Sequence, residues 1–481
     1  MLKHYLVSLL FTISLVYNSV LFAEIKLPQM GDSSGQVISP VEEKALGDAF
    51  MRELRRSATI VDDPETMEYI QALGYQIVAQ AQYPMAFNFF ILDTPSINAF
   101  AAPGGYIGLN SGLILETQTE SELASVLAHE VAHITQRHLP RAFEQASKMS
   151  LPTAAAIIAA IVLASSDPQL AQAALATGIA APQQKMINFT RKNEKEADNI
   201  GMQYLAGTHF DPHGMPNFFS RLHEAHRYNT NNLPEYLSTH PMTLSRIAES
   251  QSRAEQLPKK SDRSHESFYP FLKAKLRLRA DITGRDSIDY YADRLQQNTS
   301  FQLSDRYGYA LALLKNNTYL KASQQAEQLL KLQPENSFFI HLHAKVDIAR
   351  GKYAEAIRLL EQALTIYPRH YPLSMLMAEA LVEHGQADQA RRLLLDLIYY
   401  RKPTPGMYQL FAKASKTAGF LAESHEALAE QHYLQGAIAS AINQIDTALK
   451  TADESNFHLL SRLQARKKEL TQELKLRTQL R

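Results

Sequence analysis

The C-terminal part of this 481-residue chain repeats itself every 34 residues. Small residues recur at that interval in two series: Ala310, Ala344, Ala378 and Ala412, and Gly351, Gly385 and Gly419. A period of this length holds two short helices and their turns, and small side chains let the paired helices approach closely. Because one helix pair cannot bury its apolar side alone, neighbouring copies must stack, and we predict an elongated all-helical array.

An interval of 34 residues is that of the tetratricopeptide repeat (TPR). In the clearest copy, residues 337–368, Tyr353 and Leu360 are predicted to fill the space between the two helices. Later copies are less regular, because Ser424 replaces the expected alanine and Gly436 falls half a repeat out of phase. An undifferentiated helical bundle is the alternative. The charged amphipathic stretch 456–481 is expected to cap the array.

A chain of 481 residues is too long for one hydrophobic core, so at least two domains are expected. The polar stretch Pro258-Lys259-Lys260-Ser261-Asp262 precedes the repeats and is the predicted boundary. We therefore predict a first domain over 24–258 and the repeat domain over 259–481. The expected fold class is mainly α, with an α+β first domain that contains a small sheet.

The first 23 residues have the pattern of a secretory signal peptide. Lys3 and His4 precede an apolar stretch over 5–16, and small and polar residues then lead to Ala23, where cleavage is predicted. A membrane anchor is the alternative, although the apolar stretch is shorter than the ~20 residues that a span requires. Cleavage would export the protein, and a bacterial periplasm is the simplest destination.

Two kinds of pattern alternate within the first domain. Residues 40–82 have helical periodicity, whereas 87–92 is dense in aromatic residues and predicts a strand. The segment 98–102, the turn 103–105 and the segment 106–109 predict a hairpin, and a long helix is expected from Thr119, with Glu122 completing a capping box. The apolar stretch 151–181 is expected to form a helical hairpin over the domain; contact with a membrane is the alternative.

Charge and cysteine content restrict the function. Lys plus Arg and Asp plus Glu number 49 each, so no overall field favours nucleic acid or an anionic membrane. The chain has no cysteine, which excludes disulfides, a cysteine nucleophile and thiolate metal ligands. Any metal ion must therefore be held by histidine and carboxylate.

The segment Leu127-Ala128-His129-Glu130-Val131-Ala132-His133 carries the chemistry. On a helix, His129 and His133 project from one face a turn apart and can bind one metal ion, with Glu130 beside them. The flanking residues are apolar or small on all sides, so this helix is expected to be buried. Buried imidazoles and a carboxylate need partners, which a divalent cation provides; a core histidine pair bonded to backbone is the alternative. His138 falls off the metal face of a continuous helix.

A zinc site needs a third protein ligand, and the segment 193–201 contains the candidate. On a helix Glu194, Ala197, Asp198 and Gly201 share one face, and the two small residues allow close packing against the first helix. Glu194 is the predicted third metal ligand. Asp198 is the predicted carboxylate of the catalytic site that accepts the outer N–H of a ligand histidine, and Glu196 is expected to be solvated.

These ligands predict the mechanism of a zinc-dependent endopeptidase with one zinc ion per chain. Zinc lowers the pKa of its bound water toward ~7 and polarises the scissile carbonyl. Glu130 is the predicted general base, which takes a proton from the water and passes it to the leaving amine.

The chain resembles the gluzincin metallopeptidases that include HtpX and the CaaX prenyl proteases, in which HExxH is followed at a distance by an ExxAD-like motif, here Glu194-Lys195-Glu196-Ala197-Asp198. With its signal peptide and TPR tail, it is most similar to periplasmic members of that family. The resemblance implies a zincin-like fold and an autoinhibited zinc site. It also implies a role in quality control of outer-membrane β-barrel proteins, including the lipopolysaccharide-export barrel, with the barrel-assembly machinery as partner.

Two further segments match that family. Ser238-Thr239-His240-Pro241, followed by Arg246, resembles its His-Pro…Arg segment, in which the histidine either latches the open zinc position or hydrogen-bonds the oxyanion. A surface histidine is the alternative for His240. Residues 98–102 resemble the edge strand along which an extended substrate lies; an ordinary core hairpin is the alternative.

Two functions from different classes therefore remain open. The first is a peptidase to which the repeats present substrates or dock partners. The second is a chaperone or scaffold whose peptidase site is latched and whose repeats carry the function. The substrate, the cleavage preference and the oligomeric state do not follow from the residues.

Overall fold

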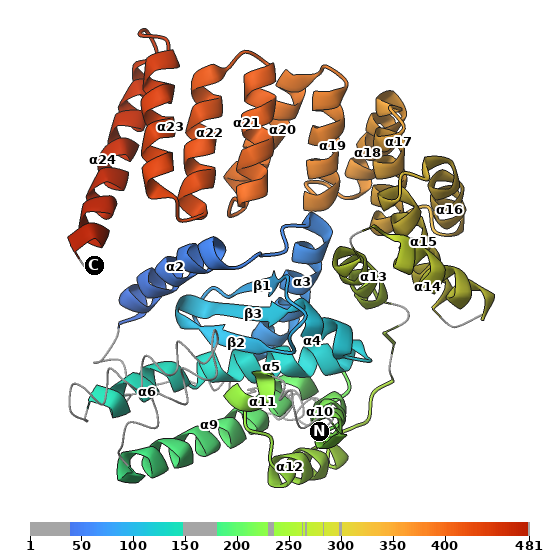
Figure 1. Cartoon of the computed structure of the whole chain (residues 1–481), viewed down its shortest axis with the longest axis vertical. Helices are drawn as coiled ribbons and strands as arrows, with labels where there is room; N and C mark the ends of the chain where they lie inside the picture. The colour runs from blue at the N-terminus through green and yellow to red at the C-terminus, as the bar shows by residue number, and fades with distance from the viewer. Residues whose placement is uncertain are drawn as a thin grey trace, which may run out of the picture.

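The computed structural model describes residues 39–147, 180–228, 235–261, 263–264, 267–281, 283–297 and 301–479. The predicted signal peptide and the apolar stretch up to residue 179 lie outside the described residues. None of the helices in these ranges is both long enough and apolar enough to cross a membrane. The chain has two parts. The first part, from α2 (Pro40–Ser57) to α12 (Leu244–Glu255), contains a small sheet. The second part, from α13 (Tyr269–Ala280) to α24 (Phe457–Gln479), is a curved array of helices that lies around one side of the first (Figure 1).

The first part begins with two helices that both have an N-terminal cap. Helix α2 (Pro40–Ser57) starts with a complete capping box between Ser39 and Glu42, and α3 (Pro64–Ala81) is capped by the Asp63 carboxylate. Both caps satisfy backbone N–H groups that the first turn of a helix leaves free. The helices predicted over 40–82 are therefore confirmed, as two helices rather than one.

The sheet has three strands in the order β1-β3-β2 (Figure 1). Strand β1 (Asn88–Leu92) pairs in parallel with β3 (Tyr106–Asn110), and β2 (Ala99–Ala102) pairs antiparallel with β3. The short helix η2 (Pro103–Gly105) joins β2 to β3, and Gly104 and Gly105 have φ angles of 73° and 78°. The predicted strand and hairpin are confirmed, and β2 is an edge strand of this sheet.

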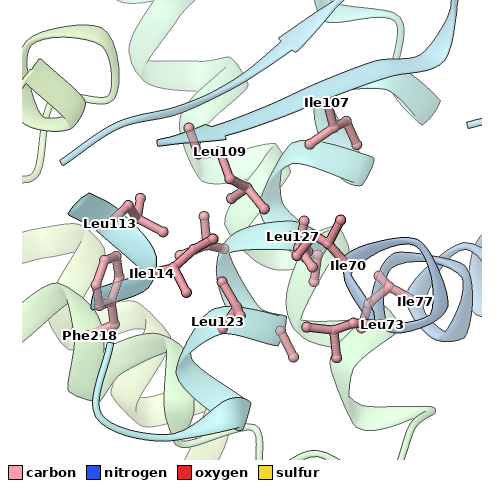
Figure 2. Close-up of a cluster of buried hydrophobic side chains, with 14 of the residues drawn as sticks. Ile70, Leu73, Ile77, Ile107, Leu109, Leu113, Ile114, Leu123, Leu127 and Phe218 are labelled. Atoms are coloured by element: carbon pink, nitrogen blue, oxygen red, sulfur yellow. The ribbon is translucent and has the colours of Figure 1, made fainter. Parts of the chain in front are cut away.

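Helix α5 (Glu120–Thr135) is the centre of the first part. It packs against α3, β2, α9 (Ala180–Ala206) and α10 (Gly214–Tyr228). Figure 2 shows Leu123 and Leu127 of α5 pointing into a cluster with apolar side chains of α3, β3 and α4 (Ser111–Glu116). The Thr119 hydroxyl caps α5, but the Glu122 carboxylate bonds the N–H of Gln118, so only half of the predicted capping box forms.

Three shorter helices complete the first part: α6 (His138–Ser147), α11 (Glu235–Thr239) and α12 (Leu244–Glu255). Helix α6 follows α5 after a break at Gln136 and Arg137, and α11 and α12 follow α10. Helix α12 packs against α9 and α10.

The array confirms the predicted tetratricopeptide-like architecture. Its helices are α13 (Tyr269–Ala280), α14 (Arg285–Gln296), α15 (Gln302–Lys315), α16 (Tyr319–Leu332), α17 (Ser337–Ala349), α18 (Tyr353–Ile366), α19 (Tyr371–Glu383), α20 (Ala387–Tyr400), α21 (Pro405–Thr417), α22 (Leu421–Leu434), α23 (Ile438–Thr451) and α24 (Phe457–Gln479). Gly351, Gly385 and Gly419 have φ angles of 75°, 83° and 88° at equivalent turns, which explains their regular interval. The buried Ser424 hydroxyl donates to the Ala412 carbonyl at 2.8 Å, so a serine is accommodated where alanine was expected.

A buried ionic cluster joins the array to the first part. Lys275 of α13 contacts Asp63 at 2.7 Å and also binds Glu65, both at the start of α3. Two array side chains approach the same Glu65 carboxylate: Nδ1 of His341 at 3.2 Å and the hydroxyl of Tyr307 at 3.4 Å. Helix α13 also contributes side chains to both neighbouring hydrophobic cores, so it is shared between the two parts.

We predict that Lys275→Met lowers the stability of the junction by about 3–5 kcal/mol, because it leaves the buried Glu65 and the half-buried Asp63 without this cation. Thermal denaturation followed by circular dichroism measures the effect. Lys331→Met is the matched control, since the Lys331–Glu327 pair is mostly exposed and should contribute less than about 1 kcal/mol. Equal unfolding temperatures for the two variants would contradict the role given to the cluster.

Candidate metal centre

Helix α5 presents the two histidines of the HExxH segment to one point. Nε2 of His129 and Nε2 of His133 are 3.0 Å apart, and both side chains lie on the helix face toward α9. His129 and Glu130 are fully buried. The expectation that this helix is buried is therefore correct, and its polar side chains must find partners inside the protein.

Close contact between α5 and α9 brings the third predicted ligand to the same point. A Cβ atom at Gly201 would lie 3.0 Å from the backbone of Ala128 and His129, and Ala197 is fully buried. Because these two residues are small, the helix axes approach closely enough for Glu194 to reach both histidines. Its carboxylate oxygens lie 3.4 Å from Nε2 of His129 and 3.4 Å from Nε2 of His133.

His240 supplies a fourth donor. Its Nδ1 lies 3.3 Å from Nε2 of His129 and 3.1 Å from the Glu194 carboxylate. The four donor atoms of His129, His133, Glu194 and His240 all lie within 4.8 Å of one another. Ligand atoms at the usual zinc distances sit about 3.3 Å apart at the corners of a tetrahedron. The spacing and the chemistry of this donor set therefore fit a zinc ion.

Asp198 and Arg246 support the donor set from behind. An Asp198 oxygen lies 3.0 Å from Nδ1 of His129, a position from which a carboxylate can fix the tautomer of the ring. Nε and a terminal nitrogen of Arg246 donate to Asp198 at 2.7 and 2.8 Å, and the other terminal nitrogen lies 2.9 Å from Glu194. The structure thus places Arg246 on the two carboxylates of α9, where it holds both in position.

The protonation states of the donor residues favour the binding of a cation between them. Burial lowers the pKa of His133 to about 4, so its ring is neutral at pH 7 and able to ligate a metal. Burial acts in the same direction on His129, but the contacts with Asp198 and Glu194 outweigh it and raise its pKa to about 10. Burial raises the pKa of Glu194, but the three histidines outweigh it and hold that pKa well below the usual value. The carboxylates therefore attract positive charge, whether a proton or a metal ion.

Glu130 has the environment of a general base. Burial raises its pKa, and the His240 ring and the backbone N–H of Ala101 oppose the rise only in part. Within the described residues neither carboxylate oxygen makes a well-formed hydrogen bond. A buried carboxylate without such bonds is costly, which fits a position that faces reacting water or substrate.

Sequence reasoning missed His138. Its Nδ1 lies 2.9 Å from Nδ1 of His133, on the side of that ring opposite the donor set. Glu196, which we expected to be solvated, accepts from His138 at 3.3 Å and from Arg141 at 3.1 Å, and its side chain is 32% exposed. The expectation for His138 assumed one continuous helix beyond His133, whereas Arg137 adopts a left-handed conformation with φ 54° and the chain turns back. Glu196 was expected to be solvated because it lies off the face of its own helix that carries Glu194, and the returning helix α6 supplies its partners.

The edge strand lies beside these side chains. Strand β2 packs against α5, and its residue Ala101 is the backbone neighbour of Glu130. The segment that carries His240 is tied to the start of this strand, because the N–H of Tyr236 donates to the Ile97 carbonyl at 2.9 Å. The His240 segment is therefore connected by a direct backbone hydrogen bond to the residues that lead into β2, the strand beside Glu130.

Comparison with known proteins gives matches for both parts of the chain. The family model described as peptidase family M48 matches residues 64–254, and a tetratricopeptide repeat model matches residues 347–414. A beta-barrel assembly-enhancing protease of Yersinia pestis is 36% identical over 436 residues, covering 90% of this chain and 89% of that protein. The protein of the same name from Escherichia coli K12 is 35% identical and covers 88% and 86%.

Two further matches are less similar to this chain. The mitochondrial metalloendopeptidase OMA1 of Schizosaccharomyces pombe is 31% identical over 186 residues, covering 38% of this chain and 51% of that protein. Among solved structures, yeast Tom70 is 13% identical with a TM-score of 0.30, covering 91% of this chain and 96% of that chain.

We predict that Gly201→Leu separates α5 from α9, because no space exists for its side chain against the Ala128 backbone. Overpacking of this kind costs about 1–3 kcal/mol, and the shift also weakens metal binding by the distant Glu194. Thermal denaturation and metal titration measure the two effects. Lys192→Leu adds the same side chain to an exposed position of α9 and should leave metal affinity unchanged. If the two variants bind metal equally well, the close crossing does not set the site.

Proposed function

The chain belongs to the beta-barrel assembly-enhancing proteases of peptidase family M48, and on that basis we propose that it is an exported zinc endopeptidase for outer-membrane β-barrel proteins. One observation carries the catalytic part of this proposal. Four donor atoms on three separate segments lie within 4.8 Å of one another, beside a buried glutamate. We assign His129, His133 and Glu194 as the protein ligands of one zinc ion.

Each residue around the ion has a role that its contacts support. When bound, zinc supplies Lewis acidity that acidifies a water molecule and polarises the scissile carbonyl. Glu130, with a pKa raised by burial, takes the proton from the water and delivers it to the leaving amine. Asp198 would keep the His129 ring in the tautomer whose Nε2 is free to bind zinc, and Arg246 keeps Asp198 and Glu194 in place.

We propose that substrate lies along β2 as an added strand. This strand is at the edge of the described sheet and next to Glu130, so pairing with it would place a peptide bond beside the base. Backbone pairing accepts many sequences but requires an extended segment. Unpaired strands of a β-barrel that has failed to close are such segments, which links this edge to the substrates that the names of the relatives indicate.

His240 would act as a latch in the resting enzyme. It occupies the fourth corner of the donor set, the position that an active zinc peptidase keeps open for water or substrate. Its segment is held by Ile97 and, through the Thr239 hydroxyl at 3.5 Å, by Asn98. Because these residues lead into β2, a peptide that pairs with the strand would compete with the contacts that hold the latch.

The same latch favours a second candidate function. If His240 seldom leaves the donor set, the repeats over residues 259–481 would carry the main role, as a periplasmic scaffold or chaperone that binds assembling barrel proteins and the barrel-assembly machinery. Helical repeats provide extended surfaces for protein partners, and nucleic acid is not a proposed partner. The cellular effect of removing catalysis alone separates the two functions.

We predict that Glu130→Gln abolishes peptide cleavage, by about 10²–10⁴-fold or more, because the amide cannot accept the proton. One zinc ion per chain should remain, measured by metal analysis of the purified protein, whereas His129→Ala should lose both. Glu327→Gln, at an exposed carboxylate of the array, is the matched control. Normal cleavage by Glu130→Gln would refute the assignment of the base, and full cellular activity of that variant would favour the scaffold.

We predict that His240→Ala increases cleavage of an unfolded protein such as casein several-fold, because the fourth corner of the donor set becomes accessible. Initial rates at equal zinc occupancy measure the change. The exposed residue His458 provides the control, His458→Ala. A large loss of activity in His240→Ala would instead identify His240 as the hydrogen-bond donor to the oxyanion.

A further inference from the structure

The two histidines of α5 are supported in different ways. Nδ1 of His129 faces the Asp198 carboxylate directly, at 3.0 Å. Within the part of the chain that the structure describes, Nδ1 of His133 faces Nδ1 of His138 at 2.9 Å rather than a carboxylate. Nε2 of His138 then contacts Glu196 at 3.3 Å, and Glu196 contacts Arg141 at 3.1 Å. We call the series His133, His138, Glu196 and Arg141 the His138 chain.

A change of chain direction makes this contact possible. In a continuous helix a residue five positions on from His133 points well away from it. Helix α5 ends at Thr135, and Arg137 has φ 54°, the left-handed conformation. Its side chain lies 3.5 Å from Glu43 of α2, which helps to hold the turn. Helix α6 then starts at His138, and the buried ring of that residue returns to the outer side of His133.

If His133 binds metal through Nε2, only one arrangement of protons gives every group of the His138 chain a hydrogen-bond partner. Nδ1 of His133 must then carry the hydrogen and donate to Nδ1 of His138. His138 therefore carries its own hydrogen on Nε2 and donates it to the Glu196 carboxylate, which Arg141 holds in place. Each donor meets an acceptor, and the direction of every bond follows from the tautomer of His133.

We propose that His138 is a positioning residue for His133: through the His138 chain, Glu196 fixes which nitrogen of His133 faces the metal ion. This inference rests on the zinc site proposed above. The neutral ring of His138 transmits the orientation but keeps the Glu196 charge one residue further from the ion than Asp198 is. The site thus has one histidine with direct carboxylate support and one with indirect support.

The test compares zinc binding by full-length variants, measured by competition with a chromophoric chelator. His138→Ala should raise the zinc dissociation constant by about 10–100-fold, as for other partners of metal-bound histidines. The Cobalt(II)-substituted variant should also have an altered visible spectrum, because the His133 ring is free to turn. Glu196→Gln should change both readouts in the same direction and by less. His138→Asn should recover part of the affinity, because its amide oxygen can accept from Nδ1 of His133.

Glu249→Gln is the matched control for Glu196→Gln. It removes a surface contact of the same helix, between Glu249 and Lys195 at 2.6 Å, and should leave zinc affinity unchanged. Circular dichroism of the metal-free proteins checks that each variant folds. If wild type binds zinc and His138→Ala has the same affinity and cobalt spectrum, the inference is overturned and the proposed peptidase remains. If wild type binds no zinc while its fold is intact, the proposed function and the inference fall together.

Discussion

The close crossing of α5 and α9 is the constraint on which the site depends. Because Gly201 has no side chain, the backbone of Ala128 and His129 can lie directly against it. Ala197 is fully buried in the same interface and is small enough to keep the two helices close. These two helices thereby place His129, His133 and Glu194 around one point, although Glu194 lies 61 residues beyond His133 in the sequence. Larger residues at this crossing would separate the ligands by the width of a side chain.

Such a crossing concentrates charge inside the protein, and the surrounding residues compensate for it. Arg246 pairs with two carboxylates and orients both, through short contacts with Asp198 and Glu194, and its single charge offsets one of their two. The remaining negative charge makes the pocket selective for a cation. Glu130 stands apart from this compensation, because its oxygens lack well-formed hydrogen bonds within the described residues. Neighbouring carboxylates therefore differ: Asp198 and Glu194 are stabilised by an ion pair, whereas Glu130 has no such pair with Arg246.

The array and the first part pack directly against each other and are not joined by a linker alone. The Lys275 cluster joins α13 to the start of α3, and α3 packs directly on α5. At the other end of the array, the Arg52 guanidinium of α2 contacts Glu473 at 3.2 Å, and α2 also packs on the turn after β2. Both ends of the array therefore contact helices that touch either the metal-ligand helix or the edge strand (Figure 1).

The sequence by itself determined the repeats, the hairpin and the local geometry of HExxH, because the spacing of residues on a helix or strand fixes which side chains share a face. It also indicated Glu194 and Asp198, because they share a helix face with the small residues Ala197 and Gly201. Tertiary structure alone decided that His240 reaches the donor set, that Arg246 lies on the carboxylates and that His138 supports His133. Those positions depend on where turns of the chain direct a segment, and the left-handed Arg137 has no glycine or periodic signal that a sequence pattern could reveal.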